Sequence, residues 1–228
     1  MKSLLKLKYE IRTCCQSFLS SLIEDSPQTI CEETFHDRSK WLKHRQFRIT
    51  GARCYGIYTY TKNKKPQWET KALKYFYPKV FKPTKEMKHG IEHESEARKT
   101  YCDEKEVEVI QFGLIVPSEN SWLGYSPDGV VFNEDGNPVK LIEIKCPFIG
   151  KKETASNILT KLSYVRLPEK TLQENHEYYG QVQLGMAILN LKKTDFIIYA
   201  SFDNSIVVIP VNIDFKFLNM MLPALKLA

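Results

Sequence analysis

The chain has 228 residues, 43% of them hydrophobic, and is therefore long enough to bury a sizeable core. Lys and Arg total 33 against 27 Asp and Glu, so the formal net charge is +6. This moderate excess suits a polyanionic partner, although many proteins that bind no nucleic acid are as basic. No apolar run approaches the roughly 18 residues of a membrane span, and charged residues interrupt the N-terminal segment where a signal peptide would be apolar. We therefore expect an intracellular protein, in the nucleus or the cytoplasm, that is neither secreted nor membrane-spanning.

Helical and β-rich segments follow one another in a simple order. Helices are expected at 3–23, 51–60, 68–77, 85–101, 153–163, 173–190 and from about 213, and the stretch from Pro27 to Asp37 is expected to break the first helical region. Strands are expected at 107–116, 122–125, 129–133, 139–145, 195–201 and 205–211. This order predicts an α/β (α+β) protein with a single domain over 1–228, in which 1–35 is a helical extension and 41–212 is the core.

The most informative segment begins with Ser126-Pro127-Asp128-Gly129 and ends with Glu143-Ile144-Lys145. The apolar, β-rich residues around these motifs predict two strands that pair across a turn at 134–138. Side chains alternate along a strand, so Glu143 and Lys145 should share one face while Ile144 points into the core. Pairing of the strands would bring Asp128 to the same place. Charges buried in this way are costly unless they have partners or a function.

Two carboxylates and an amine at one place indicate metal-dependent chemistry. Carboxylate oxygens are hard ligands for divalent cations, and two such ions can neutralise and activate the groups needed for phosphodiester hydrolysis. Lys145 would add a positive group beside the developing charge. Taken singly, Glu-x-Lys on a strand is more often a solvated face, and Asp-Gly is more often only a turn. Their combination, with Pro127 before Asp128, favours the active-site interpretation.

Two helices supply further candidates. In the helix at 85–101, Glu94 lies four residues before Arg98, so it is either one half of a surface ion pair or a third carboxylate of the site. In the helix at 173–190 the surroundings are apolar, and Gln181 therefore needs a hydrogen-bond partner that a polar site at the sheet edge would provide. Gln183 is equally compatible with an ordinary polar position on an amphipathic helix.

Glu94, Asp128, Glu143-x-Lys145 and the Gln181-Val182-Gln183 helix, in this order, resemble the PD-(D/E)XK nucleases. More narrowly, the chain resembles the branch that contains phage lambda exonuclease and the YqaJ-like viral recombinases, from about Trp41 to beyond Met186. Other matching motifs are Trp41-x-x-x-Arg45 with Ile49-Thr50, Gly90-x-x-x-Glu94-x-x-Ala97-Arg98 and Glu143-x-Lys145-Cys146-Pro147-Phe148. Each motif is weak alone, but their order is specific. The resemblance implies a restriction-endonuclease-like core, with a central mixed β-sheet flanked by helices.

The resemblance also implies a role for each candidate residue. Asp128, Glu143 and the backbone carbonyl of Ile144 would ligate Mg²⁺ or Mn²⁺, with two ions in the site. Glu94 would hold the second ion or orient water. Lys145 would activate or orient the attacking water, and Gln181 would fix that water or Lys145.

A pocket for a 5′-terminal phosphate is implied at Arg45, Ser126 and Lys151, but the chain departs from the family pattern twice. Lys151 stands where the family has an arginine, which replaces a bidentate fork by a point charge. Ala52 stands where a serine is expected, which removes a hydroxyl donor. We therefore expect cleavage to be retained and recognition of a 5′ phosphate to be reduced.

The residues predict metal-dependent phosphodiester hydrolysis, and the resemblance implies a magnesium-dependent DNA exonuclease that acts at duplex ends, 5′ to 3′, in recombination or repair. A structure-specific or endonucleolytic relative is the alternative among enzymes, because the fold hosts both activities. A catalytically idle DNA-binding module is the alternative outside enzymes, and retention of the costly site charges argues against it. By resemblance to lambda-type enzymes, the partners would be a double-stranded DNA end, two further copies in a homotrimer, and a single-strand annealing or recombination protein.

Overall fold

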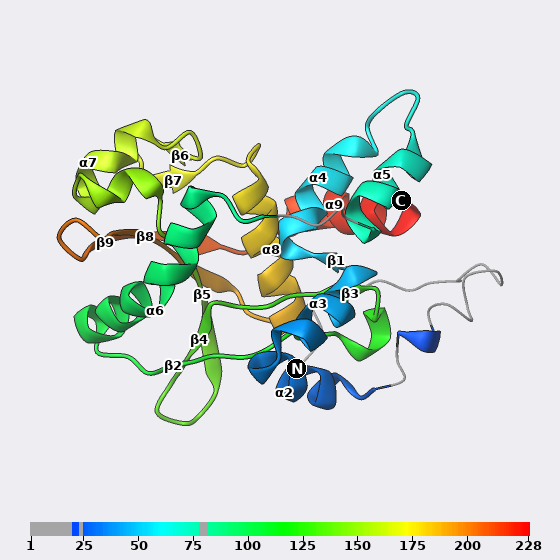
Figure 1. Cartoon of the computed structure of the whole chain (residues 1–228), viewed down its shortest axis with the longest axis horizontal. Coiled ribbons are helices and arrows are strands. Elements are labelled where there is room, and N and C mark those ends of the chain that lie inside the picture. Colours follow the sequence, from blue (N-terminus) through cyan, green and yellow to red (C-terminus); the bar gives the residue numbers. More distant parts are fainter. Residues whose placement is uncertain (1–19, 23–24, 78–81) are drawn as a thin grey trace.

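The computed structural model describes residues 20–22, 25–77 and 82–228. At its centre is a mixed sheet with the strand order β2-β4-β5-β8-β9 (Figure 1). The strands are β2 (Val109–Ile110), β4 (Gly129–Phe132), β5 (Pro138–Lys145), β8 (Lys193–Ala200) and β9 (Ser205–Asn212). β5 and β8 run parallel, whereas the other neighbouring pairs are antiparallel. A parallel pair requires a crossover connection, and here the crossover contains α8 (Glu177–Leu189).

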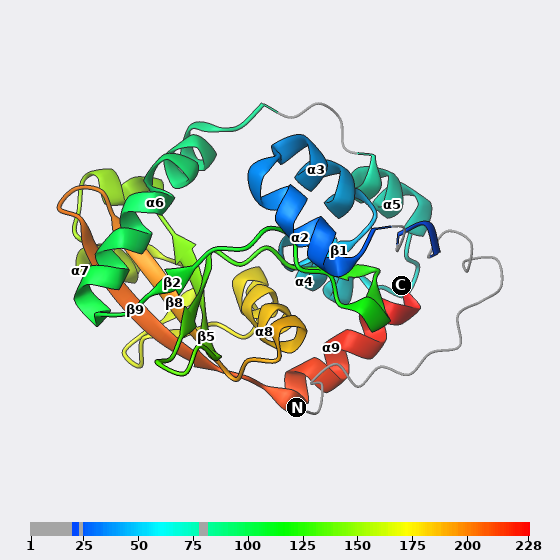
Figure 2. The same ribbon diagram turned by 90° about the horizontal axis from the view of Figure 1, so that it is seen from below.

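Helices cover both faces of this sheet. α6 (Lys85–Lys105) packs on one face, over an apolar cluster that includes Ile142 and Ile144 of β5. α8 packs on the opposite face, and α4 (Gly51–Tyr60) and α9 (Phe215–Leu227) lie against it. Figure 2 shows α6 and α8 on opposite sides of the strands. Because both faces of β5 are covered, any charged side chain on this strand must find partners inside the protein.

The remaining elements are short and lie around this core. They are α2 (Pro27–His36), α3 (Arg38–Gln46), β1 (Ile49–Thr50), α5 (Trp68–Phe76), η1 (Ser118–Asn120), β3 (Leu123–Gly124), η2 (Phe148–Lys151), α7 (Ala155–Ile158), η3 (Leu159–Lys161), β6 (Val165–Arg166) and β7 (Thr171–Leu172). β1 pairs with β3 in parallel, and β6 pairs with β7 in an antiparallel hairpin, both outside the main sheet. Within the described residues, no helix combines the length and apolarity needed to cross a membrane.

The predicted fold class is confirmed, and so is the pairing of β4 with β5 across the turn at 134–138. Several boundaries differ. The strand expected at 107–116 is reduced to β2, and the helix expected at 153–163 is α-helical only as far as Ile158. The helix expected from residue 173 begins at Glu177, because the side chain of His176 accepts the N–H of Tyr178 and caps it. The helix expected at 3–23 lies almost wholly outside the described residues.

The expected break from Pro27 to Asp37 is wrong, because residues Pro27–His36 form α2. Pro27 stands in the first turn, where a missing N–H costs nothing. The Ser26 side chain accepts the N–H of Thr29 at 3.1 Å and caps the helix. Asp37 then ends α2 and caps α3 through its contact with the N–H of Ser39 at 2.7 Å. Proline here marks the start of a helix, not its interruption.

α2 is held firmly against the segment that follows β2. Thr34 Oγ1 donates to the carbonyl of Ile30 at 2.6 Å and accepts the N–H of Leu114 at 2.7 Å. At Gly113, an added Cβ would lie 2.1 Å from the carbonyl oxygen of Cys31, so this close backbone approach requires glycine. Ile30 and Leu114 belong to a small apolar cluster that closes the contact.

Replacing Thr34 by valine tests this anchor. Thr34→Val preserves the volume but leaves the buried N–H of Leu114 without its acceptor, so we expect a loss of about 1–3 kcal/mol in the free energy of unfolding, measured by urea titration. Thr160→Val is the matched control, since Thr160 loses only an exposed hydrogen bond of 3.3 Å to Asn157. It should change stability by less than about 0.5 kcal/mol. Equal stabilities for Thr34→Val and wild type would show that this contact does not hold α2.

Candidate active site

The β4–β5 hairpin brings Asp128 beside the C-terminal end of β5, the strand that carries Glu143 and Lys145. Gly129 pairs with Ile142, so the residue before β4 lies beside the C-terminal half of β5. Asp128 Oδ2 accepts the N–H of Ile144 at 2.7 Å. Burial, followed by the nearby carboxylates of Glu143 and Glu94, raises the pKa of Asp128 well above its ordinary value. Asp128 and the strand that carries Glu143 therefore meet, and the carboxylate is held where it would prefer to be neutral.

Glu143 is enclosed and fully hydrogen-bonded. Only 2% of its side chain is exposed. Its Oε1 accepts from Lys145 Nζ and from Gln181 Nε2, both at 2.6 Å, and its Oε2 accepts from Tyr125 Oη at 2.7 Å. These donors offset the cost of burying a charge. The carboxylate is consequently fixed in one orientation, and Gln181 finds the partner that its apolar surroundings demand.

Tyr125 is a member of the site that sequence reasoning missed. Its side chain is buried, and its ring lies against Gly51 at the start of α4 and Gly185 in α8. An added Cβ at these glycines would come within 2.8 and 2.5 Å of the ring, so the two glycines make the space that Tyr125 fills. Burial and the neighbouring Glu143 raise the pKa of the Tyr125 hydroxyl, which keeps it a donor. The only feature of the sequence that could have indicated Tyr125 is its position directly before the Ser126-Pro127-Asp128 motif.

Lys145 shares the face of Glu143 and points toward α8. Its Nζ lies 4.5 Å from the ring centroid of Tyr178, in the first turn of that helix. Burial alone would lower the pKa of Lys145, but the carboxylates of Glu143 and Asp128 outweigh burial and raise it above the ordinary value. The amine is therefore a cation at neutral pH. In this state it can donate hydrogen bonds to an anionic oxygen, but it cannot accept a proton.

Glu94 approaches the site from α6. Its Oε1 accepts from Arg98 at 2.5 Å, and Arg98 Nε donates to the backbone carbonyl of Asp128 at 2.8 Å. One guanidinium thus ties α6 to the loop that carries Asp128. Burial, with smaller contributions from Glu94 and Asp128, raises the pKa of the Cys146 thiol to about 12. Glu94 is therefore both an ion-pair partner and part of the negative charge around Asp128.

A groove of about 400 Å³ opens at Asp128 and Glu94, whereas Glu143, Lys145 and Gln181 are not among the residues that line it. Its lining comes from the loop before β4, from α6, from the segment after β2, and from α2 and α3. The residues are Asp128, Glu94, Ser126, Pro127, Gln111, Phe112 and Gly113, together with Thr34, Phe35, His36, Arg38 and Trp41. The helix that the sequence did not predict therefore forms a wall of the candidate active site.

Two of the three predicted phosphate-binding residues are linked through Trp41. Trp41 Nε1 donates to Ser126 Oγ at 2.8 Å, and the guanidinium of Arg45 lies 4.0 Å from the centroid of the Trp41 ring. Burial, followed by repulsion from Arg53 and Arg38, lowers the pKa of Arg45 to about 10, which still leaves it charged at neutral pH. Arg45 and Arg38 therefore place positive charge around Trp41, which lines the groove together with Arg38.

Lys151 and Ala52 are placed differently. Lys151 is exposed in η2, with its Nζ 5.3 Å from the ring centroid of Phe148, and it is not among the residues that line the groove. Ala52 is exposed in the first turn of α4. The structure therefore joins Arg45 and Ser126 by direct contacts with one tryptophan, and it gives Lys151 a separate aromatic neighbour.

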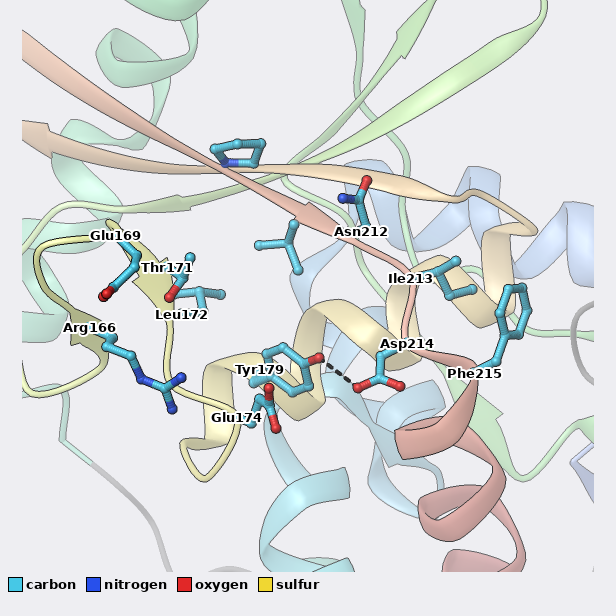
Figure 3. A pocket seen from close by; sticks show the side chains of 12 residues that line it. Arg166, Glu169, Thr171, Leu172, Glu174, Tyr179, Asn212, Ile213, Asp214 and Phe215 are labelled. Atoms are coloured by element: carbon cyan, nitrogen blue, oxygen red, sulfur yellow. Dashed lines mark hydrogen bonds between the residues drawn. The ribbon is translucent and has the colours of Figure 1, made fainter.

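Gln183 serves the fold on the far side of α8. It donates to the carbonyl of Asn212 at 2.9 Å and accepts the N–H of Asp214 at 2.8 Å, which ties α8 to the turn before α9. The same turn borders a second, larger hollow of about 640 Å³ near the β6–β7 hairpin (Figure 3). There Tyr179 points at Asp214 and donates to it at 2.9 Å. None of the predicted catalytic residues lines this hollow, so the smaller groove is the better candidate.

The donor set of the groove suits a hard divalent cation. Within residues 20–22, 25–77 and 82–228, no three His, Cys, Asp or Glu side chains are gathered closely enough to hold an ion unaided. Asp128 and Glu143 nevertheless offer two carboxylates beside a strand backbone, and oxygen donors of this kind prefer Mg²⁺ or Mn²⁺. The raised pKa of Asp128 indicates a fit, because a bound cation would offset both the burial and the carboxylate repulsion that raise it.

The cost of ionising Asp128 in the folded protein can be measured as a change in melting temperature. Asparagine keeps an acceptor for the N–H of Ile144 but carries no charge. Because the pKa of Asp128 is raised in the folded protein, its stabilising contribution is complete below the pKa of the unfolded chain and is lost as the pH rises through the folded-state pKa. We therefore expect Asp128→Asn to melt at a higher temperature than wild type at pH 8 with EDTA, and at the same temperature at pH 3. Each 1 kcal/mol gained raises the melting temperature by about 2–4 °C.

Asp135→Asn is the control for this experiment, since Asp135 lies exposed in the β4–β5 turn. Its melting temperature should match that of wild type at both pH values. A lower melting temperature of Asp128→Asn at pH 8 would mean that the ionised carboxylate stabilises the metal-free fold, contrary to this account.

The structure is similar to that of an alkaline exonuclease (LHK-Exo) from Laribacter hongkongensis, with 24% sequence identity and a TM-score of 0.62 over 83% of this chain and 89% of that one. LHK-Exo in complex with dAMP gives the same TM-score and coverage at 23% identity. A phage-related exonuclease from Haemophilus somnus 129PT has a TM-score of 0.49 and 12% identity, over 78% of this chain and 90% of that one. No curated protein sequence matches the chain significantly.

The family model of the YqaJ-like viral recombinase domain matches residues 40–196, which is more than half of the chain. This segment contains Asp128, Glu143, Lys145 and Gln181, together with the strands and the helix that position them. The chain belongs to the YqaJ-like viral recombinase domain family of PD-(D/E)XK proteins.

Proposed function

We propose that this protein is a metal-dependent deoxyribonuclease, an exonuclease that hydrolyses phosphodiester bonds at the ends of duplex DNA. One observation carries the proposal: Asp128, Glu143 and Lys145 converge in a fold similar to that of an alkaline exonuclease. The dAMP bound by that enzyme is a deoxynucleoside monophosphate, which is the kind of product that an exonuclease releases. We place the nuclease core at 41–212 of a single domain, with 1–35 as a helical extension that contributes α2 to the groove.

The metal would be held by the two acidic residues of the groove, Asp128 and Glu94, and by Glu143 beside it. Asp128, Glu143 and the carbonyl of Ile144 would hold one Mg²⁺ or Mn²⁺ ion, and Glu94 would contribute to a second. When bound, such ions supply positive charge to the phosphoryl oxygens and lower the pKa of a water ligand. Glu143 is ready for this role because Tyr125 and Gln181 already fix its two oxygens.

Lys145 would act as a fixed cation. Its pKa is raised, so it carries its proton at neutral pH and can donate to the attacking water or to a phosphoryl oxygen as charge develops there. Gln181 donates to Glu143 in this structure, so we assign it the positioning of that carboxylate. Glu143 in turn accepts from Lys145, which means that both residues take their orientation from one carboxylate.

The DNA backbone would lie near the positive charge around Trp41. Arg45 and Ser126, joined by Trp41, would contact a phosphate, and Lys151 would add a screened point charge. From the resemblance to lambda-type enzymes we also propose 5′ to 3′ polarity, a homotrimer, and a single-strand annealing partner in recombination or repair. Light scattering of the purified protein, which should give the mass of three chains, tests the trimer.

One assay tests the enzyme class. The protein is incubated with Mg²⁺ and linear duplexes labelled at either the 5′ or the 3′ end, carrying a 5′ phosphate or a 5′ hydroxyl, and with a covalently closed circular duplex. We expect mononucleotide release from the 5′ ends, a modest preference for phosphorylated ends, and an intact circle. Cutting of the circle would identify an endonuclease instead. Binding of all DNAs without cleavage at any Mg²⁺ or Mn²⁺ concentration would identify an idle DNA-binding module.

Substitutions in the same assay test the residue roles. Asp128→Ala and Glu143→Ala should abolish cleavage, because each removes metal-binding charge. Lys145→Ala should lower the rate about 10²- to 10³-fold while leaving Mn²⁺ binding intact by calorimetry, because the amine acts on water and phosphate and not on the metal. Lys145→Arg should recover little of the loss, since a guanidinium has a different shape and charge distribution. Loss of Mn²⁺ binding in Lys145→Ala would contradict the assigned role.

Tyr125→Phe tests the positioning of Glu143. The ring still fills the space between Gly51 and Gly185, but Glu143 Oε2 loses its donor in a dry environment. Hydrogen bonds to charged groups contribute about 1.5–3 kcal/mol, so we expect a fall of roughly 10- to 150-fold in rate. Part of this loss should be recovered by raising the Mg²⁺ concentration. Tyr178→Phe keeps the ring beside Lys145 and should change the rate much less. Equal rates for Tyr125→Phe and wild type would show that Tyr125 does not orient the carboxylate.

A further inference from the structure

The wall of the groove formed by the end of α2 has no role in the chemistry proposed above. Phe35 and His36 are its last two residues, and their rings meet edge to face with centroids 4.8 Å apart. Phe35 is 46% exposed. A single exposed phenylalanine is common on protein surfaces and needs no explanation by itself. Its position is what matters here, because Phe35 and His36 line the same groove as Asp128 and Glu94.

The end of α2 that forms this wall is anchored to the segment after β2. Phe35 follows Thr34, whose hydroxyl accepts the N–H of Leu114 at 2.7 Å in the buried contact described above. The backbone N of Phe35 itself lies so close to Gly113 that an added Cβ there would approach it to 2.6 Å. An aromatic ring mounted on such a fixed backbone loses little freedom when it binds a flat ligand, and this lowers the entropic cost of stacking.

The charges around the groove are arranged for a nucleotide. Asp128 and Glu94 mark the place where a metal and the scissile phosphate would lie. In α3, the guanidiniums of Arg45 and Arg38 lie 4.0 and 5.8 Å from the centroid of the Trp41 ring. Arg38 lines the groove close in sequence to Phe35. The wall therefore offers positive charge for a phosphate and an exposed ring for a base, which is how proteins bind single-stranded nucleic acid.

We infer that Phe35, braced by His36, forms a stacking subsite for one unpaired nucleobase of the strand whose backbone enters the groove. The inference rests on the proposed function and extends it, because it names a base contact in addition to the phosphate and metal contacts. Stacking tolerates any base, so the subsite would add affinity and hold the strand end without selecting a sequence. α2 lies before residue 40, where the match to the family model begins, so this contact belongs to a part of the chain outside the matched segment.

The test is a double-mutant cycle between the protein and the DNA. Affinities are measured by fluorescence anisotropy in EDTA, with a duplex that carries a short single-stranded end. An abasic residue is moved one position at a time through that end. Phe35→Ala is compared with wild type, and Phe215→Ala is the matched control, because Phe215 is a similarly exposed phenylalanine, at 49%, on the separate hollow of Figure 3. Phe35→Trp is the conservative variant.

If Phe35 stacks on a base, one position of the abasic residue should weaken binding to wild type about five-fold or more and should leave Phe35→Ala unaffected, because both changes remove the same contact. Phe35→Trp should bind at least as tightly as wild type, and Phe215→Ala should behave as wild type at every position. Additive losses at all positions, or an equal loss in Phe215→Ala, would overturn the inference. A change in oligomeric mass of Phe35→Ala by light scattering would also overturn it, since Phe35 would then contact another copy of the chain.

Failure of this inference is distinguishable from failure of the proposed function. If Phe35→Ala binds and cleaves like wild type while Asp128→Ala is inactive, the nuclease assignment stands and the stacking subsite is wrong. If wild type neither binds nor cleaves DNA under any of these conditions, the proposed function is wrong and the subsite is rejected with it.

Discussion

A single hydrogen bond, from the N–H of Ile144 to the carboxylate of Asp128 at 2.7 Å, organises the site. It exists because β4 and β5 pair in a register that places Gly129 opposite Ile142. A slip of one residue would turn Glu143 and Lys145 toward α6 and leave Asp128 facing a different peptide group. The register depends on the turn between the strands, where Gly136 adopts a φ of +74° and Asn133 accepts the N–H of Asn137 at 2.8 Å. A surface turn thus determines where the buried carboxylates meet.

The two carboxylates of this site, Glu143 and Asp128, have different surroundings. Glu143 receives three hydrogen bonds, and its position is therefore settled before any ligand arrives. The pKa of Asp128 is raised, and the positive charge of Lys145 is the main interaction that opposes this rise. A protein that only needed stability would not keep a carboxylate in such a place, because a neutral residue of the same shape would fit at lower cost. The combination of one fixed and one strained carboxylate is what a cation site requires before the cation binds.

The sequence was most informative where chemistry and periodicity reinforced one another. The β4–β5 hairpin, the strand β5 and the helices α6 and α8 could be predicted because their apolar residues alternate or repeat with the period of one element. Asp128, Glu143, Lys145 and Gln181 could be selected because charged or amide groups are unusual in such surroundings. The partner of Gln181 was not predictable. Its amide donates to Glu143, and only the packing of α8 over β5 shows this.

Features that depend on contacts between distant segments could not be predicted. Tyr125 carries no periodic signal, and its function as a donor arises from the space that Gly51 and Gly185 leave for it. α2 is not predicted by a pattern that treats Pro27 as a helix break, because proline is in fact favoured in the first turn of a helix. The position of α2 over the groove depends on Thr34 and Gly113, which are 79 residues apart in the chain (113 minus 34). No local pattern could place one against the other.

α2 lines the groove but lies before the segment that matches the family model, and this separation bears on how the groove could differ between members of the family. Asp128, Glu143 and Lys145, the proposed catalytic residues, lie within the segment that matches the family, whereas α2 and Arg38 precede it. The chemistry constrains β4, β5 and α8 tightly, because small displacements of the carboxylates or of Lys145 would abolish it. A helix that merely covers the groove is under no such constraint, provided that it remains anchored. Variation at the exposed end of α2 would therefore change the proposed stacking subsite while leaving Asp128, Glu143 and Lys145 unchanged, and in this chain that end presents a phenylalanine to the groove.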